Sequence, residues 1–99
     1  NIQPIPRDYT NVVPHIYVVR ITGMKDRKGI QRKLLEKEIQ VGYHYQPNHW
    51  LTMYSNSKSI VNTVDEIYPK LLSLPLHPGM NTSDVEFVCE SLNECATTN

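Results

Sequence analysis

The chain is organised around residues 41–50, Val41-Gly42-Tyr43-His44-Tyr45-Gln46-Pro47-Asn48-His49-Trp50. Three aromatic residues and two histidines share these ten positions, and such rings bury a flat body while keeping a hydrogen-bonding edge. The alternation predicts a short strand over residues 41–45, with Val41, Tyr43 and Tyr45 on one face, and Pro47 ends it. We therefore expect a strand that becomes a loop beside a ligand site.

The residues that follow this stretch predict a loop, a helix and a strand. Residues 48–57 lack periodicity, and connections of this length are more often functional than filler. Apolar residues at helical spacing then predict a helix over residues 60–68, capped by Ser57 or Ser59 and ended by Pro69. Residues 71–74 are short and apolar between two prolines, which favours a strand.

The residues before this stretch predict a strand and a helix. Residues 15–21 are rich in β-branched and aromatic residues, and the more apolar face is expected to point to the core. That face consists of His15, Tyr17, Val19 and Ile21. Asp26 then resembles a helix N-cap for residues 27–38. The apolar stripe of this helix is expected to be Ile30, Leu34, Leu35 and Ile39.

A last helix is expected after Asn81 or Thr82, either of which can cap it. Its buried stripe is predicted to be Val85, Val88, Cys89 and Leu92. Residues 96–99 should fray. Three short strands with amphipathic helices on one face predict an α+β domain of two layers.

Length and charge limit the classes of function. A chain of 99 residues makes one small domain that buries roughly 65% of its unfolded surface. Ten basic residues balance ten acidic ones, which argues against binding to nucleic acid or to an anionic membrane. No apolar run approaches the roughly 20 residues of a membrane span. Residues 1–13 lack an initial Met and are rich in Pro, so we expect a linker that enters a domain at residue 14.

The two cysteines, Cys89 and Cys95, are expected to be reduced. Six helical residues separate them by about 9 Å along the axis, which exceeds the reach of a disulfide. Reduced thiols are typical of a cytoplasmic protein. We expect Cys89 to be buried and Cys95 to be exposed.

The histidines allow three interpretations. A zinc site needs three or four converging ligands, and this sequence has no Cys-x-x-Cys motif, so a metal site is the least favoured. Each histidine can instead hydrogen-bond locally, or His44, Tyr45 and His49 can line a polar ligand pocket.

No catalytic constellation stands out from the residues alone. The chain lacks a nucleophile elbow, a Gly-rich phosphate loop and paired carboxylates beyond helix surfaces. Its lysines fall in turns or on polar faces, where they make poor Schiff-base amines. The chain by itself therefore looks unequipped for catalysis.

Three motifs in this order resemble a known family. They are His15-Ile16-Tyr17-Val18-Val19-Arg20, His44-Tyr45-Gln46-Pro47-Asn48-His49 and Leu72-Ser73-Leu74-Pro75-Leu76-His77-Pro78-Gly79-Met80. From about residue 14 to residue 92, the chain resembles the C-terminal small domain of the DegT/DnrJ/EryC1/StrS aminotransferases.

The resemblance implies a cofactor, a substrate and a missing partner. Family members are fold-type I, pyridoxal-phosphate-dependent enzymes that transfer an amino group, here expected from glutamate, to a nucleotide-linked keto-sugar for amino-sugar, polysaccharide, lipopolysaccharide or antibiotic synthesis. A large domain carries the cofactor lysine, and the full enzyme is expected to be a cytoplasmic homodimer. Residues 14–99 would be the small domain, inactive alone and without cofactor or metal of its own.

The resemblance also implies which residues meet the substrate. His44, Tyr45 and His49 are expected to line the nucleotide-sugar site, and Trp50 to stack on a sugar or pack on the large domain. Tyr17 and Arg20 are weaker candidates, and Arg20 fits an ordinary strand-edge ion pair better. The rings of His44, Tyr45 and Trp50 should be exposed without their natural cover. The alternative from another class is a stand-alone ligand-binding or protein-interaction module.

Overall fold

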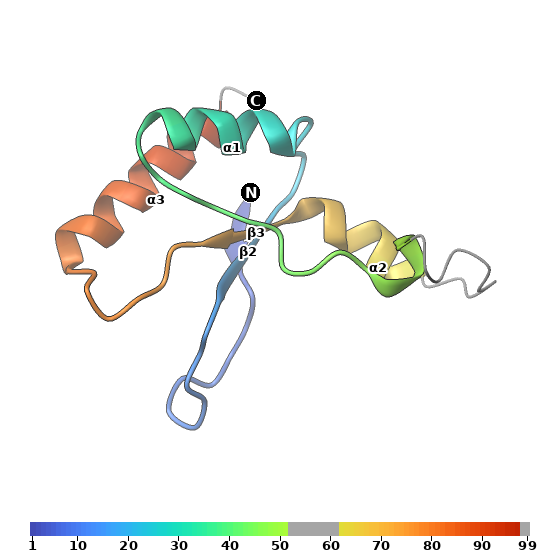
Figure 1. Ribbon diagram of the computed structural model, residues 1–99, viewed down its shortest axis with the longest axis horizontal. Helices are drawn as coiled ribbons and strands as arrows, with labels where there is room; N and C mark the ends of the chain where they lie inside the picture. Colours follow the sequence, from blue (N-terminus) through green and yellow to red (C-terminus); the bar gives the residue numbers. More distant parts are fainter. Residues whose placement is uncertain (52–61, 98–99) are drawn as a thin grey trace.

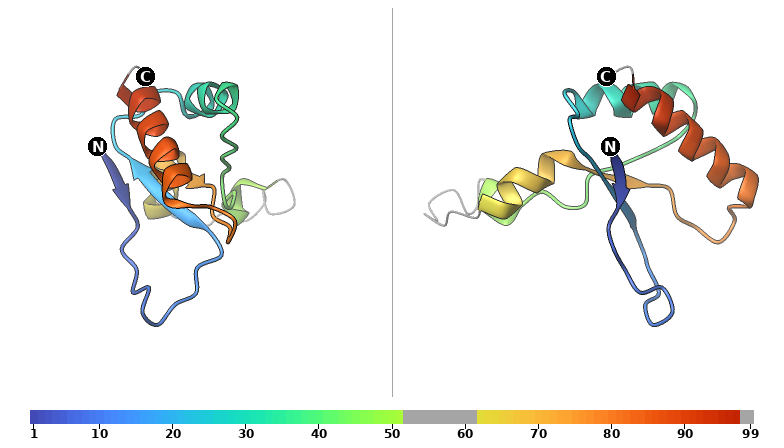
Figure 2. Two further views of the ribbon diagram at one scale, coloured as in Figure 1. Left: turned by 90° about the vertical axis from the view of Figure 1, so that its left-hand side faces the viewer. Right: turned by 180° about the vertical axis from the view of Figure 1, so that it is seen from behind.

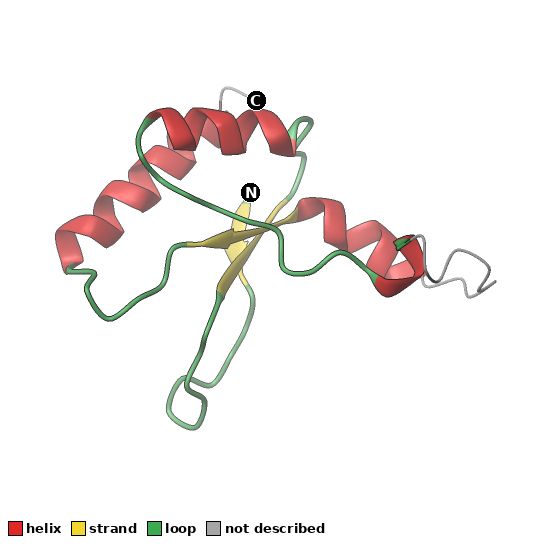
Figure 3. Cartoon of the chain, in the orientation of Figure 1, coloured by secondary structure: helices red, strands yellow, loops and turns green. Residues whose placement is uncertain are grey.

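The computed structural model describes residues 1–51 and 62–97, and it shows a three-stranded antiparallel sheet with helices around it (Figures 1 and 3). The strands lie in the order β1-β2-β3. The elements are β1 (Ile2–Pro4), β2 (Tyr17–Ile21), α1 (Arg27–Glu36), the 3-10 turn η1 (Asn48–Trp50), α2 (Asn62–Ile67), the 3-10 turn η3 (Tyr68–Lys70), β3 (Leu71–Leu74) and α3 (Thr82–Thr97).

The core lies between the sheet and two helices, α1 and α3. The sheet contributes Val19, Ile21 and Leu72, and Val19 pairs directly with Leu72 across β2 and β3. Because side chains of both helices join the same cluster as these strand residues, α1 and α3 cover one face of the sheet, while α2 extends to the side (Figures 1 and 2). The two-layer α+β arrangement is therefore confirmed, and Val19 and Ile21 point inward as predicted. His15 was wrongly assigned to the same inward face, because it precedes β2 and is exposed.

One predicted strand is absent and one unpredicted strand is present. Residues 41–45 form a single bridge, in which Gly42 and Ser73 exchange both backbone hydrogen bonds at 3.1 and 2.8 Å, and not a strand. The third strand is β1, which pairs with β2 so that Ile2 lies opposite Ile21. Strand β1 could not be predicted from the sequence, because it is only three residues long and ends in a proline. Pro4 is tolerated there because β1 is an edge strand.

Helix α1 begins at its predicted cap. The Asp26 carboxylate accepts a hydrogen bond from Gly29 N at 2.9 Å, as an N-cap should. Ile30 and Leu34 are fully buried. Leu35 was expected in the same stripe but is 61% exposed, because each residue turns the helix by about 100° and carries Leu35 away from the core.

The end of α1 is closed by a left-handed residue. Glu38 has φ 62°, and Ile39 N donates to Leu34 O at 2.9 Å while Glu38 N donates to Leu35 O at the same distance. These two bonds form a Schellman motif, which brings Ile39 back onto Leu34. Ile39 is thus buried as predicted, although it lies beyond the helix.

Helix α3 carries a buried stripe that differs from the predicted one. Asn81 caps it, since Asn81 Oδ1 accepts from Asp84 N at 2.9 Å. The buried residues are Val88, Ser91, Leu92 and Cys95, at the spacing of one helical face. Val85 is 48% exposed, so it was wrongly placed in the core.

The two cysteines are also the reverse of the prediction. Cys95 is buried and Cys89 is exposed, and neither forms a disulfide within the described residues. The stripe that starts at Val88 returns to the core at residues 91, 92 and 95, which places residue 95 inward and residue 89 outward.

The remaining expectations are met in part. Strand β3 occupies the predicted residues, and α2 ends at Ile67, two residues before Pro69. The proposed caps Ser57 and Ser59 lie outside the described residues, as do residues 98–99 of the tail expected to fray. Ala96 and Thr97 are helical. None of the helices in residues 1–51 and 62–97 combines the length and apolar character that a membrane span requires.

Candidate functional site

The segment from Tyr43 to Trp50 is fixed at its start by an arginine held between two tyrosines. The Arg27 guanidinium carbon lies 3.8 Å from the centre of the Tyr43 ring and 4.7 Å from that of Tyr68. Its Nη1 donates to the carbonyl oxygens of Tyr68 at 2.7 Å and Leu71 at 3.0 Å. Arg27 therefore joins the start of α1 to the segment on one side and to η3 on the other.

Tyr43 is held at its hydroxyl as well. The hydroxyl donates to Gln31 Oε1 at 2.6 Å, and Gln31 Nε2 donates to the carbonyl of Val41 at 3.2 Å. Burial raises the pKa of Tyr43 above its usual value, although Arg27 opposes that shift. Tyr43 is therefore a neutral donor at ordinary pH, and it serves as an anchor of the segment.

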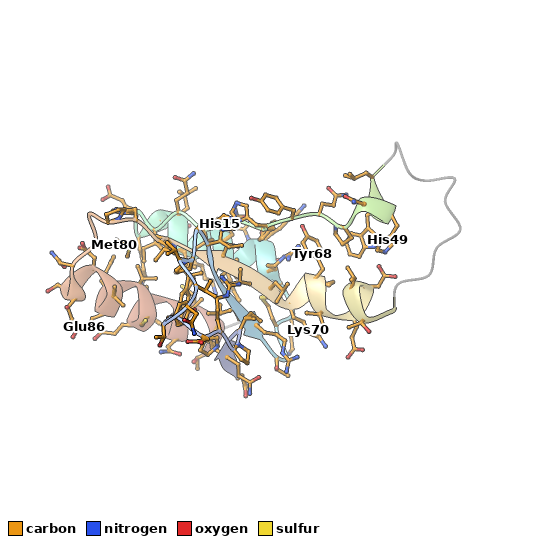
Figure 4. The ribbon with its side chains drawn as sticks, turned by 90° about the horizontal axis from the view of Figure 1, so that it is seen from below. His15, His49, Tyr68, Lys70, Met80 and Glu86 are labelled. Atoms are coloured by element: carbon orange, nitrogen blue, oxygen red, sulfur yellow. The ribbon has the colours of Figure 1, made fainter. Side chains whose placement is uncertain are left out.

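The end of the segment is fixed by a carboxylate on α2. Asp65 Oδ1 lies 2.6 Å from His49 Nε2, and the same oxygen accepts a hydrogen bond from the indole Nε1 of Trp50. The Trp50 ring meets Tyr68 edge to face at 5.3 Å (Figure 4 shows His49 and Tyr68). Hydrogen bonds from His49 and then Trp50 lower the pKa of Asp65, so this carboxyl is ionised at neutral pH.

The middle of the segment is exposed. His44 and Tyr45 meet edge to face at 4.9 Å, and Tyr45 is 69% exposed. The peptide between them is cis. Gly42 makes room for the His44 ring, since a Cβ at residue 42 would lie 3.1 Å from His44 Cε1.

A groove of about 820 Å³ opens beside the middle of the segment. Its lining combines residues 38–42 and His44, the residues that follow β3, and one side of α3. His15, His44 and His77 line it together with the apolar side chains of Met80 and Phe87 (His15 and Met80 are labelled in Figure 4). Among the described residues, no three His, Cys, Asp or Glu side chains converge as a metal site.

The structure divides the four predicted site residues into two pairs. Ring contacts join His44 to Tyr45 and His49 to Trp50, and within the described residues no ring contact joins the two pairs. His44 lines the groove, whereas His49 and Trp50 lie at the end of α2 against Asp65. The expected exposure is present, because His44 is exposed and Tyr45 and Trp50 are 69% and 42% exposed.

The two weaker candidates lie away from this segment. Tyr17 stacks on Tyr9 at 6.3 Å between ring centres. Arg20 donates to Gln3 Oε1 at 3.3 Å across β1 and β2, so its partner at the sheet edge is a neutral amide.

Sequence reasoning missed Arg27 and Asp65, which organise the segment. Both sit among charged residues of a predicted helix, and their partners come from other elements. The only available signal was the density of rings nearby, which require partners for their polar edges when they are partly buried.

Comparison with known sequences identifies the family. The profile of the DegT/DnrJ/EryC1/StrS aminotransferase family matches residues 1–93. The chain belongs to this family. The match includes residues 1–13, which were expected to be a linker, and residues 2–4 of that range pair within the sheet. A linker from a large domain stays a prediction.

Three relatives illustrate the range of this aminotransferase family. The dTDP-3-amino-3,6-dideoxy-alpha-D-galactopyranose transaminase of Aneurinibacillus thermoaerophilus is 36% identical over 81 residues, which are 80% of this chain and 22% of that protein. Spr1654 of Streptococcus pneumoniae, assigned as a sugar aminotransferase and solved in its PLP form, superposes with a TM-score of 0.86 at 22% identity. Helicobacter pylori PseC, an aminotransferase of pseudoaminic acid biosynthesis, does so with a TM-score of 0.70 at 19% identity.

The matches cover most of this chain but only part of each relative. The match covers 98% of this chain but 26% of Spr1654, and 86% of this chain but 24% of PseC. The chain thus spans about a quarter of the length of the relatives it matches. At these identities the structural likeness establishes the fold, which agrees with the α+β arrangement predicted from sequence.

Proposed function

We propose that this chain is the C-terminal small domain of a fold-type I aminotransferase that moves an amino group from glutamate to a nucleotide-linked keto-sugar. The observation that carries the proposal is the 36% identity, over 80% of this chain, to a dTDP-amino-sugar transaminase. The exposed rings of Tyr45 and Trp50 support it, because aromatic faces suit the apolar faces of sugars and bases.

The described residues of this chain do not fit the cofactor of the proposed reaction. Pyridoxal phosphate supplies the electron sink and needs a lysine for its Schiff base. Lys37 lies 2.6 Å from Glu94, Lys70 lies 3.6 Å from Glu66, and the described lining of the groove contains no lysine. We therefore assign the cofactor to the rest of the enzyme, and we expect the 99-residue chain alone to be inactive.

The contribution of this chain would be to shape one wall of the substrate site. His44 and Tyr45 would meet the nucleotide-sugar from one part of the wall, and His49 and Trp50 from another. Imidazole and indole edges can donate hydrogen bonds to sugar hydroxyls or phosphate oxygens. The large domain would cover the groove, whose neighbouring side chains Leu76 and Phe87 are 42% and 50% exposed.

The setting of the full enzyme follows the same proposal. It would act as a cytoplasmic homodimer, with the substrate site near the junction of the two domains. Its amino-sugar product would serve polysaccharide, lipopolysaccharide or antibiotic synthesis. Reduced thiols at Cys89 and Cys95 are compatible with this compartment.

The test is an activity assay on the parent reading frame. The purified parent is incubated with glutamate and a panel of keto-sugar nucleotides, and the amino-sugar product is measured by mass spectrometry. We expect transfer to at least one dTDP-linked substrate, and a pyridoxal absorbance band that the 99-residue chain lacks. A parent that transfers no amino group to any member of the panel, or a pyridoxal band in the 99-residue chain, contradicts the proposal.

A further inference from the structure

Two neighbouring rings meet one carboxylate oxygen at the end of the segment. His49 and Trp50 belong to the same 3-10 turn, η1, and Asp65 comes from α2. Their polar nitrogens converge on Oδ1 alone. The side chain of His49 is 17% exposed, so this contact lies largely out of solvent on the histidine side.

The chemistry of the three groups fixes the direction of both bonds. An ionised carboxylate only accepts hydrogen bonds, and an indole N–H only donates. His49 Nε2 must therefore carry a hydrogen while Asp65 is ionised. The described residues offer no hydrogen-bond partner to the other ring nitrogen, Nδ1. With the hydrogen on Nε2, Nδ1 is the acceptor nitrogen of the ring and can accept a hydrogen bond from a ligand.

Asp65 Oδ1 also fixes the orientation of the Trp50 indole ring. Trp50 Nε1 is held by Asp65 on one side, and its ring meets Tyr68 at 89° between planes. Tyr68 in turn contacts Arg27. Each bond constrains a ring that is otherwise free to rotate about its side-chain torsions, and preorganised rings cost less entropy on binding a ligand.

We propose that Asp65 is a positioning residue: its Oδ1 holds the indole of Trp50 and keeps the hydrogen of His49 on Nε2, which leaves Nδ1 for the nucleotide-sugar. Asp65 itself does not touch substrate in this assignment. The identity of the ligand rests on the function proposed above, whereas the positioning is a property of this chain and can be tested without activity.

The first experiment follows the indole. Trp50 is the single tryptophan of the chain, so its N–H gives one resolved signal in a proton–nitrogen correlation spectrum. The variants are Asp65→Ala, which removes the acceptor, and Asp65→Asn, which keeps one amide oxygen and the shape. Glu66→Gln is the matched control, because it also removes a carboxylate from α2 but leaves this contact intact.

We expect exchange of the indole hydrogen with water to accelerate roughly threefold or more in Asp65→Ala, since a bond to a charged acceptor has been lost from a partly exposed site. Asp65→Asn should give an intermediate rate and an altered nitrogen shift at His49 Nε2. Glu66→Gln should match the unmodified chain. If Asp65→Ala does not fold, Asp65→Asn decides alone. Equal exchange rates in the Asp65 variants and in Glu66→Gln overturn the proposal.

The second experiment measures kinetics in the parent enzyme. Asp65→Ala should raise KM for the nucleotide-sugar by about tenfold, with kcat and the KM for glutamate changed less than about twofold. The reason is that the lost contacts bind the nucleotide-sugar equally in the ground state and in the transition state. A structural fault would lower kcat and raise both KM values, which contradicts a positioning role. A parent that lacks aminotransferase activity overturns the proposed function alone, and the exchange rates still decide the role of Asp65.

Discussion

Replacing Arg27 by Met removes the guanidinium between Tyr43 and Tyr68 while keeping an apolar stem of similar length. Two hydrogen bonds from this charged donor, to the carbonyls of Tyr68 and Leu71, are lost together with two ring contacts. A bond to a charged group contributes about 1.5–3 kcal/mol, and a contact of a cation with a ring about 0.5–1 kcal/mol at a partly exposed site. Contributions from one side chain overlap, so we expect a loss of about 3 kcal/mol in the free energy of unfolding.

The assay is urea unfolding followed by circular dichroism and by the fluorescence of Trp50, whose ring contacts Tyr68. A loss of about 3 kcal/mol is a large fraction of the 5–15 kcal/mol typical of a domain. Arg32→Met is the matched control, because Arg32 is an exposed residue of the same helix and should change stability by less than about 0.5 kcal/mol. Arg27→Met and Arg32→Met with equal midpoints and slopes would refute the role of Arg27 as an anchor.

Three further predictions concern the helices. Glu38→Gly should stabilise the chain by about 0.5–1 kcal/mol in the same assay, because φ 62° is strained for glutamate and relaxed for glycine, and a destabilised variant would contradict the left-handed cap. Cys89 should react with a thiol reagent in the native state while Cys95 reacts only on unfolding, and equal native rates would contradict the buried stripe. The hydrogen bond from Lys37 lowers the pKa of Glu94 in the folded chain. The stabilisation from this ion pair is therefore fully present above the unfolded pKa of Glu94 and is lost as the pH falls through its lowered folded pKa. Glu94→Gln should remove this pH dependence, which is measured as the free energy of unfolding against pH at low salt.

The sequence was sufficient where the signal lay within one element. The Asp26 cap, the Ile30 and Leu34 stripe and the bounds of β3 all follow from a few neighbouring residues. The choice of inward face for β2 followed from its alternation, which places Val19 and Ile21 in the core.

The sequence was insufficient where a distant partner decides the structure. Residues 41–45 alternate like a strand, yet only Gly42 pairs with a strand residue, while Val41 O and the Tyr43 hydroxyl bind the side chain of Gln31 on α1. Strand β1 exists because β2 offers it an edge, which no property of residues 2–4 reveals.

The candidate site shows the same division. The density of rings in residues 41–50 marked the region, and the resemblance pointed to His44, Tyr45, His49 and Trp50. Neither the ring density nor the resemblance showed that these residues separate into two pairs. The separation depends on Asp65 of α2, which holds His49 and Trp50 and lies fifteen residues after Trp50. Whether the four residues bind a nucleotide-sugar stays a prediction.

The outer edge of β3 has a consequence for solubility. Leu71 N donates to Tyr68 O, Leu71 O accepts from Arg27, and both backbone groups of Ser73 are taken by Gly42. Pro75, the next residue in this alternation, has no N–H to offer. An unpaired edge is a template on which a second chain can add a strand and start an aggregate. The outward N–H groups of Leu71 and Ser73 are therefore occupied and Pro75 has none, so β3 offers a second chain no free donor on this edge, and Arg27 occupies the Leu71 carbonyl that such a chain would use as an acceptor.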